Sequence, residues 1–114
     1  MPNTEIDLTT FDELKQMSGA DFISELVDTF LEDGPKMIAE LRAALLAHDP
    51  DSFRRAAHSL KSNAATFGAQ HLSELAKELE MLGKESKLME TGDRLDALEH
   101  TYQAAAAELK GLRS

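Results

Sequence analysis

The stretch PDSFRRAAHSLKSNAATFG, residues 50–68, decides the fold because its apolar residues recur at intervals of four and three. This spacing places them on one side of an α-helix, as in a helix packed within a bundle. Asp49 precedes the stretch as a preferred N-cap, Pro50 suits the first helical position, and Gly68 is typical of a helix end. The predicted core seam consists of Phe53, Ala57, Leu60, Ala64 and Phe67.

The segments before this helix carry the same periodicity. Residues 21–49 form one long helical pattern that is interrupted at Gly34-Pro35. We expect a kink there rather than a break, because Pro35 removes only one amide donor and the apolar register resumes directly afterwards. A capping-box pattern in residues 10–13 predicts a short first helix over residues 8–17.

Two further helices are predicted after it. Residues 70–82 place their leucines on one side, and Gly83 ends that pattern. The last helix is expected over residues 86–112, with Gly92 weakening its first turns. Short connections make neighbouring helices antiparallel. The sequence therefore predicts an all-α fold: an antiparallel up-down four-helix bundle with a short additional N-terminal helix over one end.

The composition agrees with helices packed on helices. The chain has 114 residues, of which 42% are hydrophobic and only 5% aromatic. This length suits one domain, so we expect residues 1–114 to form a single domain with residues 1–6 as a loose lead-in. The chain contains no Cys, which excludes disulfides, thiolate zinc sites and thiol catalysis. No two histidines have the spacing of a helical metal site, so we expect no bound metal.

Charge and hydropathy limit the classes of partner that the chain can bind. The formal net charge is −9, which disfavours binding to nucleic acid. Uninterrupted apolar runs are only a few residues long, far short of the roughly 20 that span a bilayer. The N-terminal stretch MPNTEIDLTT has no basic region and no apolar core, so no signal peptide is expected. These features predict a cytoplasmic protein that binds neither nucleic acid nor membrane.

A second side of the helix at 50–68 carries unusual residues. His58 lies one position, about 100°, away from the core seam. Exposed helix positions usually hold Glu, Lys or Gln, yet the residues beside His58 are small or cationic. Small neighbours leave the imidazole open, and local positive charge in an acidic chain favours the arrival of an anion. The residues on this side are Arg54, Lys61, Ser62, Ala65 and Gly68.

These residue types favour phosphoryl transfer over hydrolysis. Without an evident orienting acid, nucleophilic Ser or metal, His58 is poorly suited to a hydrolase. An imidazole is nevertheless a nucleophile, and near neutral pH much of it has a free nitrogen lone pair. Such a nitrogen can accept a phosphoryl group, and Lys61 one turn away can offset charge on the phosphoryl oxygens.

The segment AAHSLKSNAATFGAQHLSELAKELE, residues 56–80, resembles the signature of histidine-containing phosphotransfer (HPt) domains of phosphorelays. The likeness extends to the whole chain, through the short first helix, the long second helix and the five-helix layout. Many family members carry Gly after the Lys, where this chain has Ser62, which affects how closely a partner approaches. The pattern is matched by His58, Leu60, Lys61, Ser62, Ala64 and Gly68.

The resemblance implies that His58 is the phosphoacceptor, phosphorylated on its outward nitrogen. The donor is an aspartyl phosphate on a response-regulator receiver domain, and the group can pass to another receiver. The partners are thus receiver domains, a hybrid histidine kinase, or both, and the chain is expected to be a monomer without kinase activity. It needs no cofactor of its own, because the receiver holds the Mg²⁺. Lys61 pairs with the phosphoryl group, and Gly68 serves packing and clearance.

Docking surfaces in this family use apolar residues of the first two helices. The candidates here are Phe11, Leu14, Phe22 and Leu26. Each is equally well interpreted as core, and Phe67, on the seam, is expected in the core. Two alternatives stay open. One is a helical adaptor in which His58 is inert, and the other is a phosphoacceptor domain cut from a chemotaxis-type histidine kinase.

Overall fold

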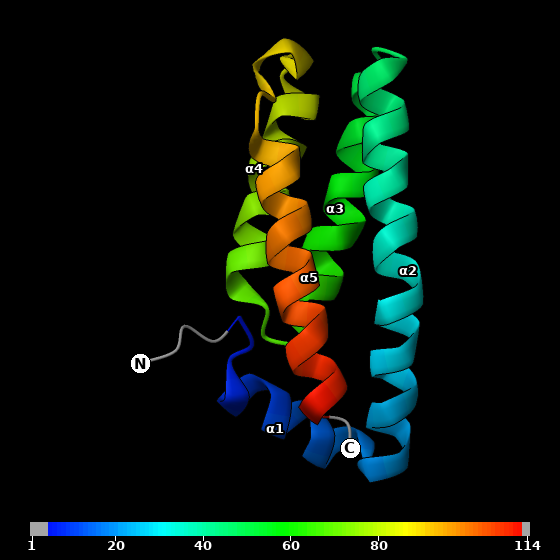
Figure 1. Cartoon of the computed structure of the whole chain (residues 1–114), viewed down its shortest axis with the longest axis vertical. Helices are drawn as coiled ribbons and strands as arrows, with labels where there is room; N and C mark the ends of the chain where they lie inside the picture. Colours follow the sequence, from blue (N-terminus) through cyan, green and yellow to red (C-terminus); the bar gives the residue numbers. More distant parts are fainter. Residues whose placement is uncertain (1–4, 113–114) are drawn as a thin grey trace.

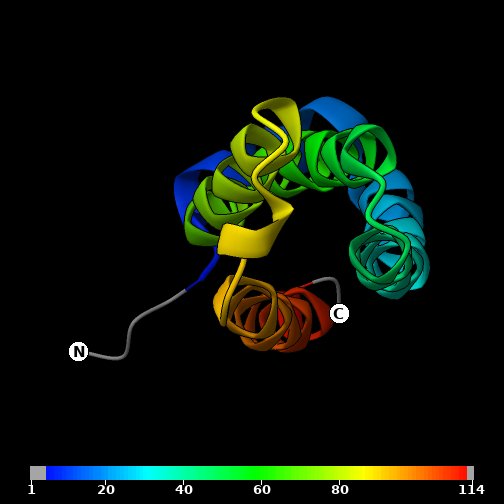
Figure 2. The ribbon, with the colours of Figure 1, turned by 90° about the horizontal axis from the view of Figure 1, so that it is seen from above.

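The structure, a computed structural model, describes residues 5–112 and consists of helices joined by short turns (Figure 1). The elements are α1 (Leu8–Ser18), α2 (Ala20–Leu46), α3 (Pro50–Thr66), α4 (Gln70–Lys84), a 3₁₀ turn η1 (Leu88–Glu90) and α5 (Arg94–Leu112). The four long helices run alternately up and down, and α1 crosses one end of the bundle. Figure 2 shows them around a common core, with α3 between α2 and α4, and α5 closing the ring. The predicted all-α bundle with an additional N-terminal helix is confirmed.

The helix starts follow from local side-chain caps. Asp49 caps α3 as predicted, because its carboxylate accepts a hydrogen bond from the backbone amide of Ser52 at 3.2 Å. At α1 the cap is Asp7, which accepts from the amide of Thr9 at 3.0 Å. The capping box predicted at residues 10–13 is therefore wrong, since those residues lie inside the helix.

The connection between α4 and α5 differs from the prediction. Gly83 lies inside α4 rather than ending it. A Cβ at Gly83 would lie 2.9 Å from the carbonyl oxygen of Pro50, so this glycine allows α3 and α4 to approach closely. The last helix begins at Arg94, not at residue 86, because the chain first forms η1 and then turns at Gly92 with a positive φ of 52°.

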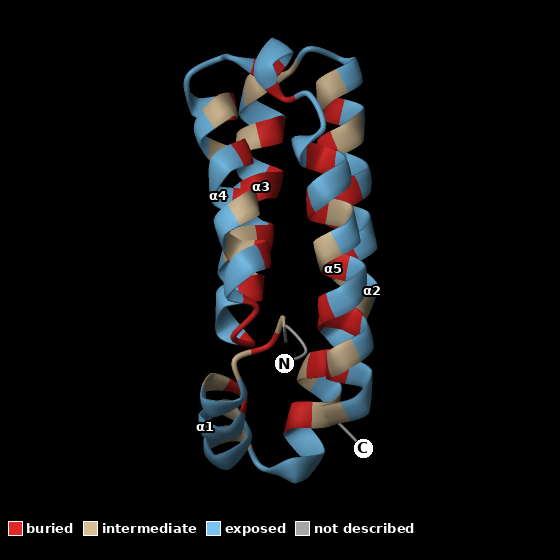
Figure 3. Ribbon diagram, turned by 60° about the vertical axis from the view of Figure 1, so that its left-hand side comes forward, coloured by how far each residue is buried: buried red, intermediate tan, exposed pale blue. Residues whose placement is uncertain are grey.

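The core lies along the axis of the bundle, where the buried sides of the helices face one another (Figure 3). All five residues of the predicted seam of α3 are at most 5% exposed, which confirms that prediction. Ile6 is also fully buried, so the loose lead-in predicted for residues 1–6 is wrong at that position; residues 1–4 lie outside the described part of the chain. No helix within residues 5–112 is long and apolar enough to span a bilayer.

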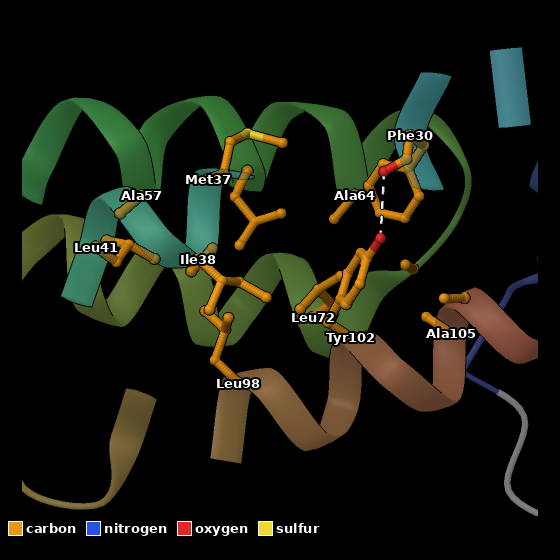
Figure 4. Close-up of a cluster of buried hydrophobic side chains, with 14 of the residues drawn as sticks. Phe30, Met37, Ile38, Leu41, Ala57, Ala64, Leu72, Leu98, Tyr102 and Ala105 are labelled. Atoms are coloured by element: carbon orange, nitrogen blue, oxygen red, sulfur yellow. Dashed lines mark hydrogen bonds between the residues drawn. The ribbon is translucent and has the colours of Figure 1, made fainter. Parts of the chain in front are cut away.

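A buried contact at the middle of α2 explains its Gly-Pro pair. The helix continues through Pro35, which has no amide hydrogen and therefore leaves the carbonyl of Leu31 without its helical donor. The hydroxyl of Tyr102 on α5 points at this turn and donates to the carbonyl oxygen of Phe30 at 3.3 Å (Figure 4). The carbonyl oxygen of Leu31 lies 3.4 Å from the same hydroxyl. A Cβ at Gly34 would lie 2.2 Å from the Tyr102 ring, so only glycine leaves room for that ring.

Candidate functional site

His58 lies near the middle of α3, on the side that faces α4. Its Nδ1 is 2.7 Å from Oε2 of Glu80 on α4, and its side chain is 57% exposed. An ionised carboxylate can only accept a hydrogen bond, so Nδ1 is the ring nitrogen that carries the proton. In the neutral imidazole the lone pair is then on Nε2, the nitrogen that does not contact Glu80 and that is available as a nucleophile.

Glu80 links His58 to Lys61. The Lys61 ammonium donates to Oε1 of Glu80 at 2.7 Å, so one carboxylate holds both basic groups. The hydrogen bond from Lys61, and secondarily that from His58, lower the pKa of Glu80 although its partial burial acts in the opposite direction. Glu80 is thus a charged, only 16% exposed anion in the site.

Glu80 is the functional residue that the sequence analysis missed, and the expectation of no orienting acid beside His58 is wrong. The sequence contained a weak signal. Glu80 directly follows the core residue Leu79 and comes four positions after buried Ala76, which places it at the edge of the apolar stripe of α4. That edge faces α3, but the sequence alone does not give the register that sets Glu80 opposite His58.

The predicted surplus of positive charge around His58 is wrong. Arg54 and Arg55 both form ion pairs with Asp51, one turn nearer the start of α3, and Lys61 is held by Glu80. The Arg54–Asp51 distance is 2.9 Å. Within the described residues, each of the three cations of this helix has an acidic partner, so Arg54 does not support His58 directly.

The small residues near His58 divide into two groups. Ser62 and Ala65 are exposed and keep the surface beyond the imidazole low, as predicted. Gly68 is buried and has a positive φ of 79°. A Cβ there would lie 2.9 Å from the carbonyl oxygen of Asp7 and 3.0 Å from the Cβ of Thr10. The room at Gly68 is thus filled by the start of α1. The predicted packing role of Gly68 is therefore confirmed, whereas the prediction that Gly68 provides clearance for a partner is wrong.

The predicted docking residues differ in how far they are exposed. Phe11 is only 2% exposed and belongs to the core, so it is unavailable to a partner. Leu14 and Leu26 are partly buried against the core, and Phe22 is 51% exposed. Phe67 is buried, as expected.

A hollow that the sequence analysis did not identify lies between α2 and α3. Its volume is about 460 Å³, and Ser59 is among the residues that line it. Alanines line much of it, and it lies on the α2 side of α3, away from the contact of His58 with α4. The lining residues include Ala43, Ala44, Ala47, Ala56 and Ser59.

The described residues form no cluster of three or more His, Cys, Asp or Glu side chains that could hold a metal ion. At His58 the third group beside the imidazole and the carboxylate is the ammonium of Lys61, which is a donor and not a ligand. The arrangement is suited to nucleophilic chemistry at nitrogen with a cation nearby.

Comparison with known proteins gives a family match that includes the site at His58. The family model for the Hpt domain matches residues 25–108, a range that contains His58, Lys61 and Glu80. The phosphorelay protein LuxU of Vibrio harveyi is 31% identical over 91 residues, which cover 79% of this chain and 80% of LuxU. The sensor protein TorS of Escherichia coli K12 is 29% identical over 75 residues, or 66% of this chain, but they span only 8% of TorS.

A solved structure resembles the whole fold. The crystal structure of histidine-containing phosphotransfer protein B (HptB) from Pseudomonas aeruginosa PAO1 superposes with a TM-score of 0.91 at 26% identity. The match covers 98% of this chain and 96% of HptB. The likeness therefore includes α1 as well as the four helices of the bundle.

Proposed function

This chain belongs to the Hpt domain family, and we propose that it is a phosphorelay intermediate in which His58 is the phosphoacceptor. The likeness to a phosphorelay protein and to a phosphotransfer protein supports the role of intermediate. The observation that carries the proposal for His58 is the hydrogen bond from its Nδ1 to Glu80, which leaves Nε2 as the nucleophile of an exposed imidazole.

In the proposed reaction, the donor is an aspartyl phosphate on a response-regulator receiver domain. The lone pair of Nε2 forms the nitrogen–phosphorus bond as the phosphorus–oxygen bond breaks, and the aspartate leaves as a carboxylate. Nδ1 keeps its proton throughout, and Glu80 offsets the positive charge that develops on the ring. Lys61 offsets the charge on the phosphoryl oxygens. Attack by the aspartate of a second receiver reverses these steps.

Kinase activity and Mg²⁺ come from other proteins in this proposal. Hpt phosphotransfer proteins are carriers rather than kinases, and we assign this chain no kinase activity. We assign the Mg²⁺ of the reaction to the receiver. The proposed partners are receiver domains, alone or within a hybrid histidine kinase, and the proposed working form is a cytoplasmic monomer. The imidazole is 57% exposed, which leaves it accessible to such a domain.

Incubation with a phosphorylated receiver tests this function. We expect the wild-type chain to acquire a phosphoryl label that is labile in acid and stable in alkali, as for a phosphoramidate. His58→Gln is expected to abolish the label, because the amide lacks a nucleophilic lone pair. The control is His100→Gln, at an exposed histidine of α5, which should label like the wild type. Label that persists in His58→Gln overturns the assignment of His58, and a wild-type chain that binds the receiver without labelling favours an adaptor.

A further inference from the structure

The bridging position of Glu80 has a consequence for the phosphorylated protein, one that rests on the proposed function of His58. We propose that the Glu80 carboxylate sets how readily the phosphoryl group leaves His58, by opposing its charge and competing with it for Lys61. Glu80 is thereby a positioning residue that also determines the balance between the phosphorylated and free forms.

The opposition of charges follows from the position of Glu80 on the ring. Its Oε2 lies 2.7 Å from Nδ1, so a phosphoryl group on Nε2 is separated from this carboxylate by a single imidazole. The lowered pKa of Glu80 keeps the carboxylate charged at neutral pH. Two anions at such short range repel each other, and partial burial of Glu80 weakens the screening by solvent. This repulsion is opposed by the attraction between Glu80 and the cationic ring. A phosphoryl group carries close to two negative charges and the ring one positive charge, so the net charge that Glu80 faces in the phosphorylated state is negative and raises its free energy.

The competition for Lys61 acts in the same direction. Its ammonium is bound to Oε1 of Glu80 at 2.7 Å in the free protein, and its side chain is only 28% exposed. To pair with the phosphoryl oxygens, the ammonium must leave Glu80 or be shared between two anions. Part of the stabilisation that Lys61 gives to the phosphoryl group is therefore offset by the interaction that it loses with Glu80.

The hydrogen bond to Nδ1 adds a kinetic component. Glu80 holds the proton on Nδ1, so the phosphorylated ring stays in its cationic form. In this form the imidazole leaves phosphorus more easily, because the electron pair of the broken bond returns to a positively charged ring. The carboxylate thus favours return of the group to a receiver aspartate. A residue with an uncharged acceptor would keep the orientation of the ring and lose these charge effects.

Glu80→Gln tests the charge, since its amide oxygen still accepts a hydrogen bond from Nδ1. The measurement is the equilibrium ratio of phosphorylated to free protein against one purified receiver, together with the half-life of the phosphorylated protein. We expect the ratio to move toward the phosphorylated protein by about three- to tenfold, the size of one partly screened charge interaction, with a longer half-life. Glu78→Gln, the same charge change at an exposed position of α4, should behave like the wild type.

Two more variants separate charge from orientation and folding. Glu80→Ala removes the acceptor as well, so it should also slow the acceptance of the group. Lys61→Met leaves the carboxylate in place without its cation, so it should move the equilibrium in the opposite direction, toward the free protein. Far-ultraviolet circular dichroism verifies that each variant is folded.

The outcomes distinguish this inference from the function on which it rests. A wild-type chain that takes no label contradicts the phosphorelay function itself. A labelled wild type, with Glu80→Gln and Glu78→Gln at the same equilibrium ratio, overturns the role of Glu80 and leaves the function intact. A shift of Lys61→Met in the same direction as Glu80→Gln also overturns it, because the two residues would then not oppose each other.

Discussion

Two polar contacts between helices can be compared. In the first, His58 and Lys61 of α3 contact Glu80 of α4. In the second, Tyr102 of α5 contacts the turn of α2 at Phe30 and Leu31. Both are polar contacts between neighbouring helices, but they lie in different surroundings. The first joins an exposed imidazole, 57% accessible, to an ion pair that is partly buried. The second is a neutral hydroxyl in the core, on a residue that is 5% exposed.

This difference teaches which contact serves stability and which serves function. A buried carbonyl that loses its hydrogen-bond partner pays the full cost of desolvation, so the Tyr102 contact contributes to the folded state. Charges at the surface are solvated in the unfolded chain too, so their pairing contributes little to stability. The exposure of His58 leaves its ring accessible during a reaction.

Gly34→Ala is expected to have the largest effect on stability. The added Cβ would overlap the Tyr102 ring, and overpacking of this kind costs about 2–3 kcal/mol. Urea denaturation gives the free energy of unfolding. Gly111→Ala is the matched control, because nothing lies within 4 Å of its Cβ and alanine there should be neutral or stabilise α5 by up to about 1 kcal/mol. Equal stabilities of the two variants would show that the ring does not pack on Gly34.

Tyr102→Phe is expected to be intermediate, with a loss of about 1–2 kcal/mol from the Phe30 carbonyl left without the hydroxyl. The rate of phosphoryl transfer should not change, since the contact lies away from His58. A change in rate without a change in stability would contradict this separation of the two regions.

The pH profile provides a second measure of the same contact. Burial, and secondarily the charge of Asp33, raise the pKa of Tyr102 to about 12. The raised pKa means that its contribution is fully present below about pH 10, where the unfolded tyrosine titrates, and is lost as the pH rises toward 12. Near-ultraviolet titration of this sole tyrosine should therefore show ionisation above the ordinary range in the folded protein.

Lys61→Met is expected to have the smallest effect on stability, below about 1 kcal/mol, although it slows phosphoryl transfer. The loss should be seen at neutral pH and should vanish in acid. The lowered pKa of Glu80 means that its ion pair stabilises the protein above the unfolded pKa near 4.5 and is lost as the pH falls through the lower folded value. Urea denaturation at both pH values measures this difference, with Lys77→Met as an exposed control. A difference that persists in acid would assign the effect to packing instead.

Part of the site that the sequence analysis misjudged was nevertheless local. Asp51 comes three and four residues before Arg54 and Arg55, which is the spacing of ion pairs on a helix. This signal was present in the sequence and predicts that the two guanidinium groups are neutralised. The burial of Phe11, in contrast, depends on how α1 lies across the end of the bundle, and periodicity within α1 does not distinguish a core residue from a docking residue there.

The sequence by itself determined the number and order of the long helices, the core seam from Phe53 to Phe67, and the position of His58 and Lys61 on one side of α3. These features follow from periodicity and capping, which act over a few residues of one segment. Only the tertiary structure decided that Glu80 faces His58. It also decided that α3 packs closely on Gly83 and that the Tyr102 ring packs on Gly34. Each of these contacts joins two helices. Their register is set by the packing of the whole core, which no single segment encodes.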